Sequence, residues 1–250
     1  MIPIRDINPS LRTPLITFLL VAASVAVYFL VQPADPAEEL EFLYRQAAVA
    51  CELTTGESLS LDEVVGQQCT AGGERPLFPD KSPGLSVIVS MFLHGGLAHL
   101  AANMWSLFLF GNNVEDAYGR FGYLLLYLIS GVVATVGFVV LNPQTTVPLV
   151  GASGAIAGVM GAYLVLFPRA RVVSVFPLLF FIPFTIPAVW FLLFWFAGQF
   201  AFTAADTGIA WEAHVTGFLF GMLVTLVSRG PLLRRLARLE RRRLARMGYI

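Results

Sequence analysis

The chain has 250 residues, of which 57% are hydrophobic and 13% are charged, and its formal net charge is zero. Soluble domains are about 45–50% apolar and about 25% charged, and a soluble chain of this length could not bury so much apolar surface in its core. The composition therefore excludes an ordinary soluble enzyme. We expect an integral membrane protein whose partners include membrane lipid and no nucleic acid.

Six apolar stretches follow one another along the chain, and each approaches the roughly 20 residues that a membrane-spanning helix needs. We therefore predict an all-α membrane protein with six spans. The predicted spans cover residues 15–31, 95–111, 122–141, 149–167, 172–202 and 211–228. They leave an N-terminal segment (1–14), one long loop (32–94) and an arginine-rich tail (229–250).

The basic residues are divided unevenly between the two sides of the predicted bundle. Lysine and arginine favour the cytoplasmic side of a membrane. Thirteen of the sixteen basic residues fall on the side of the two termini, whereas the long loop carries three of them and ten acidic residues. We therefore predict cytoplasmic termini and an external loop over residues 32–94. The tail is interpreted as a topology anchor against anionic lipid, with a partner-binding role as the alternative.

Cys51 and Cys69 are the two cysteines of the chain, and both fall in the external loop. Their spacing does not resemble that of a metal site, and we predict no metal and no other cofactor. In an oxidising compartment, a disulfide closing this loop of about 18 residues would contribute roughly 3 kcal/mol in the chain-entropy model. Two free buried thiols are the equally weighted alternative.

Polar side chains inside the predicted spans are candidates for function, because they are costly at membrane depth. His99 and Asn103 stand four residues apart and share one helix face. Ser153 lies in a Gly-x-Ser-Gly tetrapeptide, and His214 lies near the start of the sixth span. Each observation alone also fits helix packing, through an interhelical hydrogen bond or through small residues that allow close approach.

The predicted depths of these side chains coincide. The second, fourth and sixth predicted spans all begin at the external face. At a rise of 1.5 Å per residue, Ser153 and His214 lie roughly 8 Å below the starts of their spans, and His99 lies roughly 6 Å below the start of its span. A neutral imidazole can take the proton of a serine hydroxyl, and nearby N–H groups can stabilise an oxyanion. We therefore predict a Ser-His dyad, without a third carboxylate, in a water-accessible site near the external face.

Four motifs on these spans together resemble those of the rhomboid family of intramembrane serine proteases. The resemblance covers about half of the chain, from roughly Phe92 to Gly221. Its motifs are FLHGGLAHLAAN at 92–103, FGNNVED at 110–116, GASG at 151–154 and AHxxGxxxG at 213–221. The resemblance implies a six-helix bundle in a cell membrane, which we expect to be a bacterial plasma membrane.

The resemblance also implies the roles of individual residues. Ser153 is the implied nucleophile and His214 the implied general base and acid, whereas His99 and Asn103 would stabilise the oxyanion. The implied substrates are single-pass membrane proteins, cut near the outer membrane boundary. The fifth span and the loop after it would form a lateral gate.

Other residues of the motifs are expected to be structural. Gly217 and Gly221 would let the sixth span pack closely against the fourth, and His94 and Glu115 resemble hydrogen-bonding positions of the family. The chain departs from some members at Ala157, where an aromatic residue would stack on the catalytic histidine. It also lacks a tryptophan in the external loop.

Two other functions remain compatible with the sequence. The first is an inactive rhomboid-like protein that binds transmembrane clients, although such proteins usually lack the serine or the histidine. The second is a small transporter, although transporter sites tend to lie near the membrane midplane between internal repeats, and neither feature is visible. The sequence makes no prediction of the oligomeric state.

Overall fold

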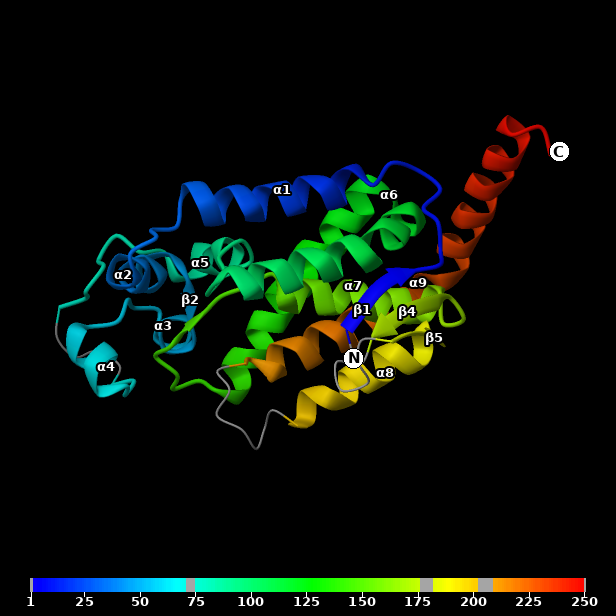
Figure 1. Ribbon diagram of the computed structural model, residues 1–250. Helices are drawn as coiled ribbons and strands as arrows, with labels where there is room; N and C mark the ends of the chain where they lie inside the picture. Colours follow the sequence, from blue (N-terminus) through cyan, green and yellow to red (C-terminus); the bar gives the residue numbers. More distant parts are fainter. Residues whose placement is uncertain (1, 71–74, 176–181, 202–208, 250) are drawn as a thin grey trace.

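The computed structural model describes residues 2–70, 75–175, 182–201 and 209–249. Most of these residues are helical. The bundle is made of α1 (Leu15–Leu30), α6 (Leu97–Leu141), α7 (Ser153–Leu166), α8 (Ala188–Gln199) and α9 (Trp211–Arg246). Figure 1 shows α1 and α8 on the outside of the bundle and α9 projecting from it at its C-terminal end. α7 is the central helix, because every residue from 154 to 163 is buried.

α6 is two helices joined at Gly119, whose φ of 74° and ψ of 165° are not helical. The predicted second span ended at residue 111, but the helix continues to this break. Two buried polar side chains within that extra stretch bind the N-terminal part of the chain. Glu115 accepts hydrogen bonds from the backbone N–H groups of Ile16 (3.1 Å) and Thr17 (2.9 Å) at the start of α1. Asn113 donates to the carbonyl of Asn8 at 2.9 Å.

The predicted fifth span over residues 172–202 is wrong at residues 172–175 and 183–187, which form strands, whereas residues 176–181 and 202 of that span lie outside the described residues. Strands β4 (Arg171–Val175) and β5 (Pro183–Pro187) pair with each other, and β1 (Ile2–Asp6) pairs with β4 in an antiparallel sheet of order β1-β4-β5. Proline lacks a backbone N–H and disfavours helix in the residue before it. This stretch contains Pro183 and Pro187, and the helix α8 therefore starts only after Pro187. The described chain is predominantly helical, as predicted, but the all-α prediction fails at the three strands of this sheet.

The tail does not form a unit separate from the sixth span. α9 passes through residue 229 without a break and ends at Arg246, although Pro231 lies inside it. Among the described helices, α6 and α9 are long and apolar enough to cross a membrane by length and composition, whereas α1, α7 and α8 are apolar but shorter.

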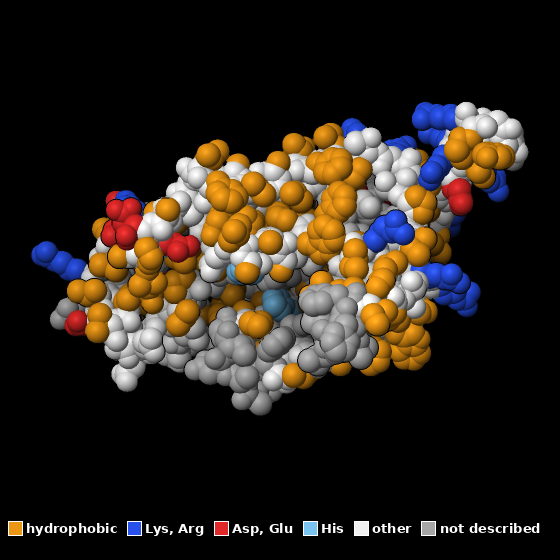
Figure 2. Space-filling view, viewed as in Figure 1, with side chains coloured by type: hydrophobic (Ala, Val, Ile, Leu, Met, Phe, Trp, Pro, Cys, Tyr) orange, Lys and Arg blue, Asp and Glu red, His pale blue; other side chains and the backbone are white. Residues whose placement is uncertain are grey.

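The surface of the bundle is apolar in its middle and charged at its ends. Large exposed apolar side chains include Phe29, Phe108, Leu125, Trp190, Phe194 and Leu223. In Figure 2 the acidic side chains gather at the end that carries the external loop, and basic side chains predominate at the end that carries the C-terminal part of α9. Such a surface fits a molecule whose middle lies in lipid.

The described residues of the predicted external loop fold into small helices at one end of the bundle (Figure 1). These are α2 (Pro36–Gln46), α3 (Ala50–Thr55), α4 (Leu61–Gly66) and α5 (Pro83–Ser90). A short ladder between β2 (Ala48–Val49) and β3 (Pro148–Leu149) ties this region to the segment that precedes α7.

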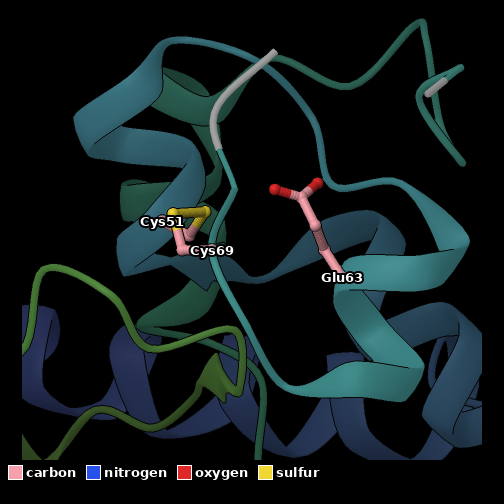
Figure 3. A group of neighbouring side chains, drawn as sticks. All are labelled: Cys51, Glu63 and Cys69. Carbon is pink, nitrogen blue, oxygen red and sulfur yellow. A yellow bond between two sulfur atoms is a disulfide. The ribbon is translucent and has the colours of Figure 1, made fainter. Parts of the chain in front are cut away.

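Cys51 and Cys69 form a disulfide within this region of small helices (Figure 3). Of the two alternatives, the disulfide is therefore confirmed. Glu63 lies beside the bridge, and its carboxylate and the two sulfurs are close enough together to hold a metal ion. The sulfurs bond to each other, however, and so do not supply the thiolates that a metal binds. Glu63 instead forms a capping box with Ser60 at the start of α4.

Candidate active site

Glycines bring the backbones of α7 and α9 into direct contact. A Cβ atom on Gly217 would overlap with the carbonyl of Gly154, and one on Gly221 would overlap with that of Gly158. Only glycine allows this approach, because any side chain would push the two helices apart. The expectation that Gly217 and Gly221 permit close packing of these two helices is therefore confirmed.

This packing places Ser153, at the start of α7, against His214, in the first turn of α9. The Oγ atom of Ser153 lies 2.8 Å from Nε2 of His214, which is the distance of a good hydrogen bond. Both side chains are half-buried. Figure 2 shows histidine side chains in a hollow of the molecular surface, in the apolar middle of the face. The two residues predicted as a dyad are thus brought together although they are 61 positions apart in the sequence.

The other ring nitrogen of His214 has a partner that the sequence reasoning missed. Its Nδ1 atom lies 2.7 Å from Oε1 of Gln199, at the end of α8. The indole ring of Trp195, one turn earlier on α8, packs at a tilt against the imidazole, with ring centroids 6.1 Å apart. Gln199 and Trp195 thus contact the imidazole of His214 from α8, whereas the small side chain of Ala157 cannot stack on it. The sequence signal for this partner is a glutamine inside an apolar stretch, but Gln199 is neither ionisable nor part of the four motifs.

His99 lies at the same site. A Cβ atom on Gly151 would come within 2.8 Å of the His99 ring and 3.6 Å of Ser153 Oγ, so Gly151 separates the two side chains. Its φ of 121° also favours glycine. The Nδ1 atom of His99 accepts a long hydrogen bond from Gly95 N–H at 3.4 Å. In the neutral ring this leaves the Nε2–H as a donor on the side of Gly151.

Two further donors suit an oxyanion. Asn103 is buried, and within the described part of the chain its Nδ2 atom has no hydrogen-bond partner. Ser153 is the first residue of α7, where backbone N–H groups lack an intrahelical acceptor. The partial positive charge of a helix N-terminus would favour a developing anion there.

His94 and Gln32 fix the segment that leads into α6. The Gln32 side chain accepts from His94 N–H and donates to His94 C=O, both at 2.9 Å. The carbonyl of Ser90 accepts from Gly151 N–H at 2.9 Å. The contacts of Glu115 agree with the expectation of a structural role for that residue. Those between His94 and Gln32 run through the backbone of His94, while its ring Nδ1 lies 3.3 Å from the carbonyl of Phe92 and its Nε2 has no hydrogen-bond partner among the described residues.

Comparison with known proteins supports the same family. The family model described as Rhomboid domain matches residues 83–230. The chain is 41% identical to Rhomboid protease GluP of Bacillus subtilis over 78 residues. This matched region is 31% of this chain and 15% of that protein. It is 31% identical to Rhomboid protein 1, mitochondrial, of Saccharomyces cerevisiae over 150 residues. This matched region is 56% of this chain and 40% of that protein.

The chain thus matches less than half of the length of either relative. The family match itself covers more than half of this chain. It includes the four motifs and all four predicted site residues. The chain belongs to the rhomboid family, whose members are integral to membranes.

Proposed function

We propose that this protein is an intramembrane serine endopeptidase that cleaves transmembrane segments near the outer leaflet. The observation that carries the proposal is the 2.8 Å contact between Ser153 Oγ and His214 Nε2. A serine hydroxyl becomes an effective nucleophile when a neighbouring base removes its proton. The alternatives, an inactive client-binding relative and a small transporter, give no reason for this pairing.

The proposed reaction proceeds in two halves. His214 Nε2 takes the proton as Ser153 Oγ bonds to the carbonyl carbon of the scissile peptide. His214 then gives that proton to the departing amine as the C–N bond breaks, which leaves an acyl-enzyme. In the second half His214 deprotonates a water molecule that attacks the ester, and the returned proton regenerates Ser153.

The oxyanion formed in each half needs donors on the opposite side of the carbonyl. His99 Nε2–H, Asn103 Nδ2 and the backbone N–H of Ser153 are the proposed donors. The buried Asn103 amide supports this role, because a buried donor without a partner is costly unless something binds it. One such donor typically contributes about 3–4 kcal/mol to transition-state stabilisation.

The proposed topology has six spans, with the two halves of α6 counted separately and both termini in the cytoplasm. Ser153 and His214 lie near the N-terminal ends of α7 and α9, at the end of the bundle that carries the external loop (Figure 1). The segregation of acidic and basic side chains supports this orientation. We place the protein in a bacterial plasma membrane, with single-pass membrane proteins as its substrates.

The proposed lateral gate consists of α8 and the segment that follows it. α8 lies at the edge of the bundle (Figure 1) and carries exposed apolar residues on its outer face. Residues 202–208 of the proposed gate lie outside the described residues. A substrate helix entering beside α8 would meet the Ser-His pair directly.

The test is cleavage of a reporter protein with one transmembrane segment, reconstituted with the purified protein in liposomes. The parent protein is expected to cut the reporter within or at the edge of its membrane segment. Ser153→Ala is expected to abolish cleavage and to retain the thermal stability of the parent. Retained cleavage by a folded Ser153→Ala variant would overturn the assignment of the nucleophile.

A further inference from the structure

We infer that Gln199 is a positioning residue that sets the protonation pattern of His214 and makes it a base toward Ser153. This inference rests on the proposed protease function and deepens it. Gln199 is the last residue of α8 and is only 4% exposed. A polar amide is costly in such a place unless its donors and acceptors are used.

The orientation of the Gln199 amide follows from its second contact. Its Nε2 atom donates to the backbone carbonyl of Trp195 at 3.1 Å. A carbonyl oxygen can only accept, so the amide nitrogen must face Trp195 and the amide oxygen must face His214. The contact of 2.7 Å between Oε1 and His214 Nδ1 is therefore one in which the histidine donates.

This fixes the hydrogen on His214. A neutral imidazole carries one N–H and one acceptor nitrogen. With the hydrogen held on Nδ1 by Gln199, Nε2 has its lone pair free and faces Ser153 Oγ at 2.8 Å. The opposite tautomer would set two acceptors, Oε1 and Nδ1, against each other. In a Ser-His-Asp triad the aspartate holds the imidazole in the correct tautomer and orientation. Gln199 has the same effect on His214, but it carries no charge.

No acid takes over this role in the described part of the site. Glu212, two residues before His214, instead accepts a hydrogen bond from Asn142 at 3.1 Å. On α6, His99 is the titratable side chain that interacts electrostatically with His214. From α7 the imidazole meets Ser153, and from α8 it meets the uncharged Gln199 and Trp195.

The contact also links the base to the position of α8. α8 packs on α9 through aromatic pairs such as Phe196 with Phe218, at 4.9 Å between centroids. His214 therefore has its acceptor only while α8 is docked against α9. A substrate that displaced α8 on entry would release the imidazole until the helix closed again.

The experiment measures the rate at which a fluorophosphonate probe labels the full-length protein in detergent between pH 5 and 9. Gln199→Leu removes the acceptor at similar volume, and Gln199→Glu restores an acceptor oxygen. The matched control is Phe196→Leu, which reduces one aromatic contact between α8 and α9 and changes neither partner of the hydrogen bond. Thermal unfolding is recorded for each variant.

We expect Gln199→Leu to label about 10- to 100-fold more slowly than the parent, the size expected for one hydrogen bond to a group that becomes charged. Gln199→Glu is expected to label within tenfold of the parent. Its loss of labelling toward acid should move to higher pH by about 1 unit or more, because a carboxylate stabilises the imidazolium. Phe196→Leu should unfold at lower temperature and keep the pH profile of the parent.

Parent-like labelling by Gln199→Leu would overturn the inference and leave the proposed function standing. Equal slowing in Gln199→Leu and Gln199→Glu, with the parent's pH profile in both, would reduce Gln199 to a packing role and also overturn it. A folded parent that the probe does not label at Ser153 would overturn the proposed function, and this inference with it.

Discussion

Gly221 of α9 lies so close to the backbone of Gly158 of α7 that a single side-chain carbon would overlap with the peptide group. The same relationship holds one turn earlier between Gly217 and Gly154. Ser153 directly precedes the second of these contacts on α7. The separation of the proposed nucleophile and base is therefore set by two rigid backbones in contact, and much less by the side chains around them.

Gly221→Ala is expected to separate α7 from α9. Overpacking of this kind typically costs about 1–3 kcal/mol, and here it would also stretch the contact between Ser153 and His214. We expect a lower unfolding temperature in detergent and a loss of reporter cleavage that exceeds the loss of folded protein. The matched control is Gly230→Ala on the same helix, where the added carbon would have its nearest neighbour at 3.7 Å. Equal stability of the two variants would contradict the packing account.

Glu115→Gln is expected to loosen the start of α1. The carboxylate accepts from Ile16 N–H, Thr17 N–H and the Thr17 hydroxyl at 2.9–3.1 Å, and Pro14 provides no side-chain cap there. An amide can accept through only one of its two positions, so at least one N–H loses its partner at a cost of about 1–3 kcal/mol. Thermal unfolding and proteolysis of residues 1–14 would measure the effect. Glu240→Gln, at an exposed glutamate, serves as the control and should match the parent. If Glu115→Gln also matches the parent, these hydrogen bonds are dispensable.

The region of small helices from α2 to α5 should lose stability in acid through Glu63. Burial raises the pKa of Glu63, but hydrogen bonds from the N–H and hydroxyl groups of Ser60 and Thr70 together lower it to about 2. A carboxylate with a lowered pKa stabilises the folded state above its ordinary pKa of 4.5, and that contribution disappears as the pH falls from 4.5 toward 2.

Glu63→Gln should therefore be less stable than the parent at pH 7, and the difference should shrink at pH 3. The free energy of unfolding of the two proteins at both pH values measures this. Glu57→Gln, at an exposed glutamate of the same region, serves as the control and should match the parent. A deficit of Glu63→Gln that is as large at pH 3 as at pH 7 would rule out the charge as its cause.

The sequence predicted those parts of the fold and site that depend on local pattern. Ser153 and His214 could be found because their motifs put a nucleophile and a base at similar depth, and Gly217 and Gly221 because their spacing repeats along one helix face. Strands β4 and β5 were missed because apolar, β-branched residues suit a buried strand and a membrane span equally well. The prolines within that stretch were the signal against a single helix.

The remaining differences come from contacts between distant parts of the chain. α6 continues past residue 111 because Glu115 binds the start of α1, nearly 100 positions away. Gln199 gains its role only when α8 packs beside α9, and no spacing in the sequence relates Gln199 to His214. Long-range pairing of this kind leaves no periodic pattern in one sequence.

If His214 makes Ser153 nucleophilic, a fluorophosphonate should react with Ser153 alone and only slowly without the imidazole. Peptide mapping after labelling at pH 8 compares the parent, Ser153→Ala, His214→Ala and the control Ser106→Ala. We expect one adduct, on Ser153, in the parent and the control, no adduct in Ser153→Ala, and labelling slower by about 100-fold or more in His214→Ala. An adduct on another residue, or labelling of Ser153 at the parent rate in His214→Ala, would rule out this activation.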